Sequence, residues 1–140
     1  MRRFLFTIKA LFVAAAVIGS MAFVYALKNA PVFEKGERYE FYLGTSSEEV
    51  VLAQSPLAKL FLKNIKGESV RYKGDRVQEL ISRFNAEILF VEEAAGVTNY
   101  YCYTSALKGG VQLGEYCVNL HVAVDKEQTA AGTPLIFGGF

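Results

Sequence analysis

Two cysteines and one histidine are the side chains of this sequence best suited to chemistry. Cys102 and Cys117 are the only cysteines among its 140 residues, and His121 is the only histidine. The two cysteines lie symmetrically about Gly109-Gly110, so a hairpin folded at that pair would place them opposite each other, where a disulfide could form. Unpaired packing is the alternative, because cysteine is also a common small core residue.

Strand geometry argues against a metal site built from these residues. Cys117 and His121 are four residues apart on a predicted strand, which separates their Cα atoms by roughly 13 Å at about 3.3 Å per residue. Zinc–ligand bonds are only about 2.0–2.3 Å long, so the two residues cannot readily share one ion. Cys102 could still approach His121 across strands, as nucleophilic catalysis would require. We predict no metal and no cofactor.

Glu92 and Glu93 are candidates for a general acid/base pair. Such a pair needs convergent carboxylates, at least one of them desolvated. Neighbouring residues on an extended chain point to opposite faces, so a solvated turn is the simpler interpretation. Tyr100, Tyr101 and Tyr103 could stack against a sugar ring, but tyrosines are also common on packed sheet faces.

Residues 75–105 form the element around which the chain is organised, with the order helix, strand, turn, strand. Asp75 can cap the helix, and an apolar stripe at i, i+3, i+4 and i+7 follows it. The stripe consists of Val77, Leu80, Ile81 and Phe84. Residues 86–91 then predict a central strand, residues 92–96 a turn, and residues 97–105 a second strand.

The flanking segments predict further strands and one more helix. Residues 37–43 and 48–54 read as a hairpin with a turn at 44–47, and residues 68–72 and 115–124 read as strands. Ser55 and Pro56 predict a helix start, with Leu57, Leu60 and Phe61 on its buried side. The pattern is that of an α+β domain, in which one or two helices pack on one face of a largely antiparallel sheet.

The C-terminal residues 133–137 predict an edge strand. Leu135, Ile136 and Phe137 are too apolar to remain in water, whereas Pro134 cannot donate a ladder hydrogen bond, so an edge position satisfies both. Because exposed edges pair with other chains, these three residues are the predicted interaction edge for a homodimer or an extended peptide.

The N-terminal residues predict export. Residues 10–27 carry no charge and follow Arg2, Arg3 and Lys9. This pattern is typical of a secretory signal, with cleavage after Ala26, or of an uncleaved membrane anchor with its basic flank in the cytoplasm. We expect residues 1–27 to be the signal or anchor, 28–36 a linker, and 37–140 a single extracytoplasmic domain.

Charge and composition bound the function classes. After the apolar segment the sequence has twelve basic and fourteen acidic residues, so the net charge of this part is slightly negative. Such a charge gives nucleic-acid binding no support. An apolar fraction of 52% argues against disorder.

Several short segments resemble the YwmB family of exported proteins from Gram-positive spore-forming bacteria. The resemblance is carried by residues 119–124 with the sequence NLHVAV and 132–136 with GTPLI. Residues 67–70 and 96–101 also resemble small clostridial proteins that lie near this family. It implies a TATA-box-binding-protein-like fold and no established activity. Family members of the Bacillus type have two related halves, whereas this chain has room for one.

The sequence therefore favours a non-catalytic envelope domain that binds a protein or a cell-wall component. An envelope hydrolase that uses Glu92, Glu93 or Cys102 is the alternative, and a nucleic-acid binder is a weaker one. The membrane would be a further partner through residues 10–27 if the segment stays uncleaved.

Overall fold

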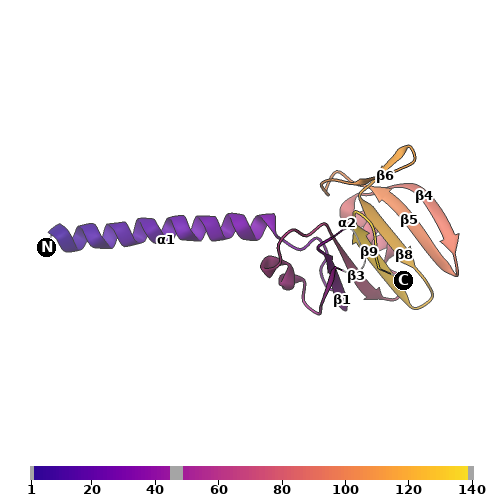
Figure 1. The fold of residues 1–140 in the computed structure, drawn as a ribbon, viewed down its shortest axis with the longest axis horizontal. Coiled ribbons are helices and arrows are strands. Elements are labelled where there is room, and N and C mark those ends of the chain that lie inside the picture. The colour runs from indigo at the N-terminus through magenta and orange to yellow at the C-terminus, as the bar shows by residue number, and fades with distance from the viewer. Residues whose placement is uncertain (1, 45–48, 139–140) are drawn as a thin grey trace. The chain divides into compact units, whose positions relative to one another are not determined.

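The computed structural model describes residues 2–44 and 49–138 (Figure 1). The chain divides into two compact units, Met1–Pro31 and Val32–Phe140. The first unit is helix α1 (Arg2–Lys28), whose segment Phe6–Lys28 is long and apolar enough to cross a membrane and is not buried in the structure. The predicted N-terminal apolar helix is therefore confirmed.

The second unit is an α+β domain built on a seven-stranded antiparallel sheet, as predicted. The strand order is β2-β1-β3-β9-β8-β5-β4 (Figure 1). Its strands are β1 (Arg38–Tyr42), β2 (Val50–Ala53), β3 (Gly67–Lys73), β4 (Glu87–Ala94), β5 (Val97–Tyr103), β8 (Leu120–Val124) and β9 (Gln128–Thr133). A separate hairpin pairs β6 (Val111–Leu113) with β7 (Tyr116–Val118). The predicted turn at 44–47 lies largely outside the described residues.

Helix α2 (Val77–Phe84) packs on one face of the sheet and forms the core with it. Val77, Leu80 and Phe84 are buried, which confirms the predicted stripe. The core residues that they join on the sheet include Val70, Leu120, Val122 and Ala131. The N-cap position is Arg76 and not Asp75 as predicted, but Asp75 still accepts a hydrogen bond from the Val77 amide at 2.9 Å and so satisfies one of the free amides at the start of the helix.

The residues from Val32 to β1 pack as part of the compact unit that contains the sheet. Phe33 is fully buried and packs edge to face on Phe84, with ring centroids 5.7 Å apart. The amides of Val32 and Phe33 donate to Oε1 of Glu68, at 2.6 and 3.4 Å. The compact unit thus begins at Val32, inside the stretch 28–36 that the sequence suggested as a linker.

The helix expected after Ser55 differs from the prediction. It is a six-residue 3-10 helix, η1 (Pro56–Phe61), which Ser55 caps by accepting from the Leu57 amide. A 3-10 helix has three residues per turn, so different residues share its faces. Leu57 and Phe61 are therefore exposed, and the predicted buried stripe is wrong for them.

The predicted C-terminal edge strand is also wrong. The last strand, β9, ends at Thr133 and lies in the middle of the sheet, between β3 and β8, whereas β2 and β4 form the two edges. Its centre consists of the small residues Ala130, Ala131 and Gly132, all buried. These residues carry little strand propensity, which is why the pattern pointed to the more apolar segment that follows.

The strand predicted at residues 86–91 is β4, but it is an edge strand and not a central one, and the turn between β4 and β5 is shorter than expected. Its two central residues are Ala95 and Gly96, with φ of 52° and 81°, the backbone that a tight two-residue hairpin turn requires. Glu92 and Glu93 therefore lie on β4 and pair with Asn99 and Thr98, and are not part of the turn.

Candidate binding face

The sheet face opposite α2 carries a stack of aromatic rings. Phe90, Tyr101 and His121 are direct partners across β4, β5 and β8. The ring centroids of Phe90 and Tyr101 are 4.4 Å apart at 15°, and those of Tyr101 and His121 are 4.5 Å apart at 11°. These spacings match the distance of about 4.7–4.9 Å between neighbouring strands. The rings therefore stand upright on the sheet with their faces against each other.

Tyr116 of β7 extends this row from the separate hairpin. Its ring centroid lies 5.5 Å from that of Phe90 at 36°. The side chain is 38% exposed, while Phe90 and Tyr101 are half-buried and His121 is buried. We call these four residues the aromatic stack.

Polar groups line the outer edge of the aromatic stack. Burial is the main reason why the pKa of Tyr101 lies above its ordinary value, and its hydroxyl also donates a hydrogen bond to the exposed carboxylate of Glu92. His121 Nε2 lies 3.1 Å from Oδ1 of Asn99. The stack thus presents ring edges, a carboxylate and an amide to the solvent.

The hydrogen bonds of His121 define its protonation state. Its Nδ1 accepts from the Ile136 amide at 3.3 Å, so the single ring proton resides on Nε2 and is donated to Asn99. Burial lowers the pKa of His121 to about 4. The ring is therefore neutral near pH 7, and it is buried and hydrogen-bonded at both nitrogens.

The three predicted interaction residues lie on this same face, beside the aromatic stack. The Phe137 ring contacts that of Tyr42 edge to face, with centroids 4.9 Å apart, and the Gly138 amide donates to the Tyr42 hydroxyl at 3.0 Å. A Cβ atom on Gly132 would lie 2.7 Å from the Leu135 carbonyl oxygen, so the chain can fold back closely only over glycine. Leu135, Ile136 and Phe137 are thus half-buried against the sheet surface.

A buried polar cluster lies beneath this C-terminal segment. Glu40 is 4% exposed, is paired with Arg38 at 2.6 Å and Arg71 at 3.5 Å, and accepts from the Tyr42 hydroxyl at 2.9 Å. Burial acts to raise the pKa of Glu40, but the hydrogen bonds from Arg38 and Tyr42 and the charge of Arg71 hold it below its ordinary value. A buried carboxylate that is paired with arginines and hydrogen-bonded in this way stabilises the folded sheet.

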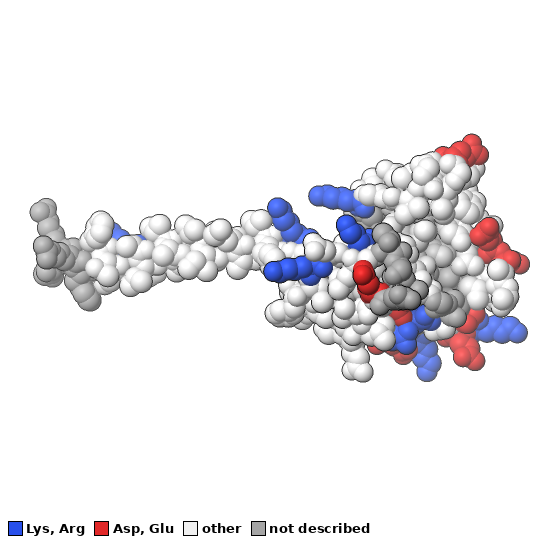
Figure 2. Space-filling view, viewed as in Figure 1, with Lys and Arg blue, Asp and Glu red and all other residues white. Residues whose placement is uncertain are grey.

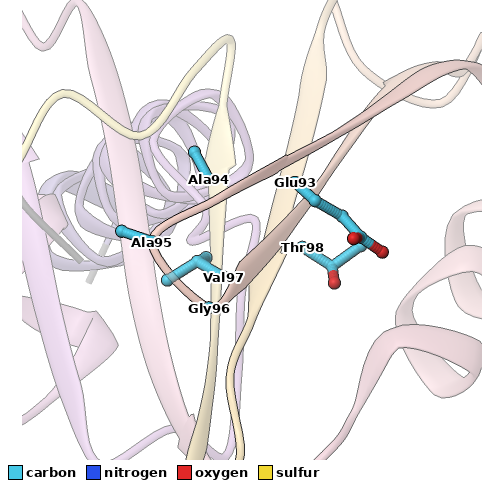
Figure 3. Close-up of a pocket in the computed structure, with 6 residues that line it drawn as sticks. All are labelled: Glu93, Ala94, Ala95, Gly96, Val97 and Thr98. Atoms are coloured by element: carbon cyan, nitrogen blue, oxygen red, sulfur yellow. The ribbon is translucent and has the colours of Figure 1, made fainter.

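The structure separates the predicted catalytic residues. Glu93 lies with Ala94, Ala95, Gly96, Val97 and Thr98 around a hollow of about 250 Å³ at the end of the β4–β5 hairpin (Figure 3). Glu92 points to the other side of the strand, toward Tyr101. Cys102 is fully buried on the helix side, and burial raises the pKa of its thiol to about 11. These three side chains do not converge.

Both cysteines are free, as in the unpaired alternative, and the symmetric hairpin around Gly109-Gly110 that would have placed them opposite each other does not form. Cys102 lies opposite Leu120, and Cys117 lies opposite Gln112. The cause is Asn119, which interrupts the predicted strand 115–124. Its buried amide accepts from the Thr104 amide at 2.8 Å and donates to the Thr104 carbonyl at 2.7 Å, so β7 leaves the sheet. Among the described residues, no group of three or more His, Cys, Asp or Glu side chains is placed to hold a metal ion.

Phe90, Tyr116 and Asn99 were not singled out in the sequence. Cross-strand register was the missing signal, because Phe90 meets Tyr101 only through the irregularity between Ile88 and Phe90. Comparison of the chain with protein-family models, with curated proteins and with solved structures gave no match.

Proposed function

We propose that this protein is a non-catalytic binding module of the cell envelope. The domain is either held at the outer surface of the membrane by α1 or released from it after cleavage. The basic residues before the apolar segment support an orientation with the N-terminus in the cytoplasm and the α+β domain outside. The resemblance to the exported YwmB family agrees with this location.

The half-exposed aromatic stack is the observation that supports binding. Tyrosine is enriched at protein interfaces, where its ring contributes apolar area and its hydroxyl contributes a hydrogen bond. Both faces of Tyr101 are covered, by Phe90 on one side and His121 on the other. A sugar needs a free ring face to stack on. The geometry therefore favours a protein partner over a cell-wall polysaccharide.

The competing functions have less support. A hydrolase would need Glu92, Glu93 or Cys102 to meet a catalytic partner, and these side chains lie on different faces or in the core. A nucleic-acid binder would need a basic face, whereas acidic and basic side chains are both present on the face of the domain that Figure 2 shows. A homodimer through a C-terminal edge strand loses its basis, because that segment packs on the sheet face.

The location is tested by a reporter fused after Phe140. We expect a reporter that is active only outside the cytoplasm to be active in this fusion, and a cytoplasm-only reporter to be silent. Replacement of Arg2, Arg3 and Lys9 by neutral residues should weaken this orientation. Activity of the cytoplasm-only reporter in the wild-type fusion would contradict the proposed function.

The binding face is tested by photo-crosslinking in cells. Tyr116 is replaced by p-benzoylphenylalanine, and adducts are identified by mass spectrometry after irradiation. The matched control is the same replacement at Val91, which is 46% exposed and lies on the opposite face of the sheet. We expect a discrete protein adduct from position 116 only. Equal adducts from both positions, or none from 116, would contradict a partner on the aromatic stack.

A further inference from the structure

The 3-10 helix η1 exposes two large apolar side chains. Phe61 is 86% exposed, the highest value among the large apolar side chains of the described residues, and Leu57 is 57% exposed. Other residues of this segment fix it to the domain, because Ala58 and Leu62 pack against the core and Lys59 forms an ion pair with buried Glu68. The fold therefore holds Leu57 and Phe61 in water on a firmly attached segment.

Positive charge accompanies these apolar side chains. Between residues 54 and 67 the sequence holds Lys59, Lys63 and Lys66 and no acidic residue. Lys59 is engaged by Glu68, whereas Lys63 and Lys66 are exposed. Apolar side chains flanked by lysines are typical of segments that lie in the interface of a membrane with anionic lipids.

A shared carboxylate joins η1 to the first residue of the domain, which follows α1 after a short connection. Glu68 accepts from the Val32 amide through Oε1 and binds Lys59 through Oε2, so η1 and the first residue of the domain meet at one carboxylate. Only residues 29–31 separate Val32 from Lys28, the last residue of α1. Four Cα–Cα steps of about 3.8 Å limit this distance to roughly 15 Å.

We propose that η1 docks on the lipid bilayer, with Leu57 and Phe61 inserted at the level of the headgroups and Lys63 and Lys66 in contact with anionic phosphates. This inference rests on the anchored form of the proposed function, in which α1 is not cleaved and remains in the membrane. The domain is then held against the membrane surface by two points, the end of α1 and η1.

The absence of tryptophan from the sequence allows a direct test with the full chain. Phe61→Trp is reconstituted in nanodiscs of equal parts phosphatidylcholine and phosphatidylglycerol, with and without bromine-labelled acyl chains. Val91→Trp is the control, because it reports from β4, the edge strand farthest from β2. We expect bromine-labelled lipid to reduce the emission of the tryptophan at 61 about two-fold or more, as for an interfacial side chain, and to leave that at 91 unchanged. In the background of Phe61→Trp, Lys63→Gln with Lys66→Gln should reduce this quenching.

The outcomes separate the inference from the proposed function. If the protein is retained in nanodiscs but both tryptophans are equally unquenched, the docking is overturned and the anchor stands. Shielding of the tryptophan at 61 from iodide without quenching by lipid would indicate a protein contact and would also overturn the proposal. Failure of the chain to enter nanodiscs would overturn the docking and the anchor together.

Discussion

Phe84→Ala is expected to lower the free energy of unfolding by about 3–5 kcal/mol, the range for removal of a buried phenyl ring. Phe84 is 8% exposed at the end of α2 and packs edge to face on Phe33. Its loss removes the contact that joins α2 to the residues before β1 and leaves a cavity between them. Urea unfolding of the full chain in a mild detergent, followed by near-ultraviolet circular dichroism of the tyrosines, measures the change.

Asp75→Ala is the matched comparison at the other end of the same helix. It removes a single hydrogen bond, from the Val77 amide, and should cost about 1 kcal/mol. Similar urea midpoints for the two variants would show that the buried face of α2 is misassigned.

Stability is expected to fall by about 2 kcal/mol between pH 7 and pH 5 because of His121, as linkage gives for a pKa near 6.5 unfolded and about 4 folded. The unfolded chain takes up the proton as the pH falls through 6.5, whereas the folded ring stays neutral until about pH 4. The stabilisation is therefore complete above pH 6.5 and is lost below it. Protonation of Nδ1 in the folded state would oppose the Ile136 amide directly.

Unfolding free energies of the wild type and of His121→Gln at pH 7 and pH 5 test this expectation. The glutamine variant should lose most of the pH dependence in this interval. Its absolute stability is not the readout, because the aromatic stack is also altered. An equal drop in both proteins would assign the pH dependence to other groups.

Local sequence patterns predicted those elements whose own residues show a clear apolar periodicity. The apolar stripe of α2 proved correct, since burial of an apolar face dominates at its positions. The central strand β9 could not be recognised, because Ala130, Ala131 and Gly132 contribute a smooth surface and not strand propensity.

The candidate site depends on which residues lie opposite each other on neighbouring strands, and the periodicity of a single sequence does not reveal this register. Tyr101 and His121 attracted attention as residue types, but their stacking follows from the register of β5 and β8. The pairing of Cys102 and Cys117 failed for a similar reason, because one side chain, that of Asn119, redirects the chain between β7 and β8.

The position of β9 has a consequence for the order of events in the cell. The strands β2-β1-β3 and β8-β5-β4 meet only through β9, which comes from residues 128–133. Until those residues have emerged from the ribosome, β3 and β8 each lack the neighbouring strand with which they form hydrogen bonds in the complete sheet. The complete sheet can therefore form only late in synthesis, because the strand that joins its two halves follows all the other strands in the sequence.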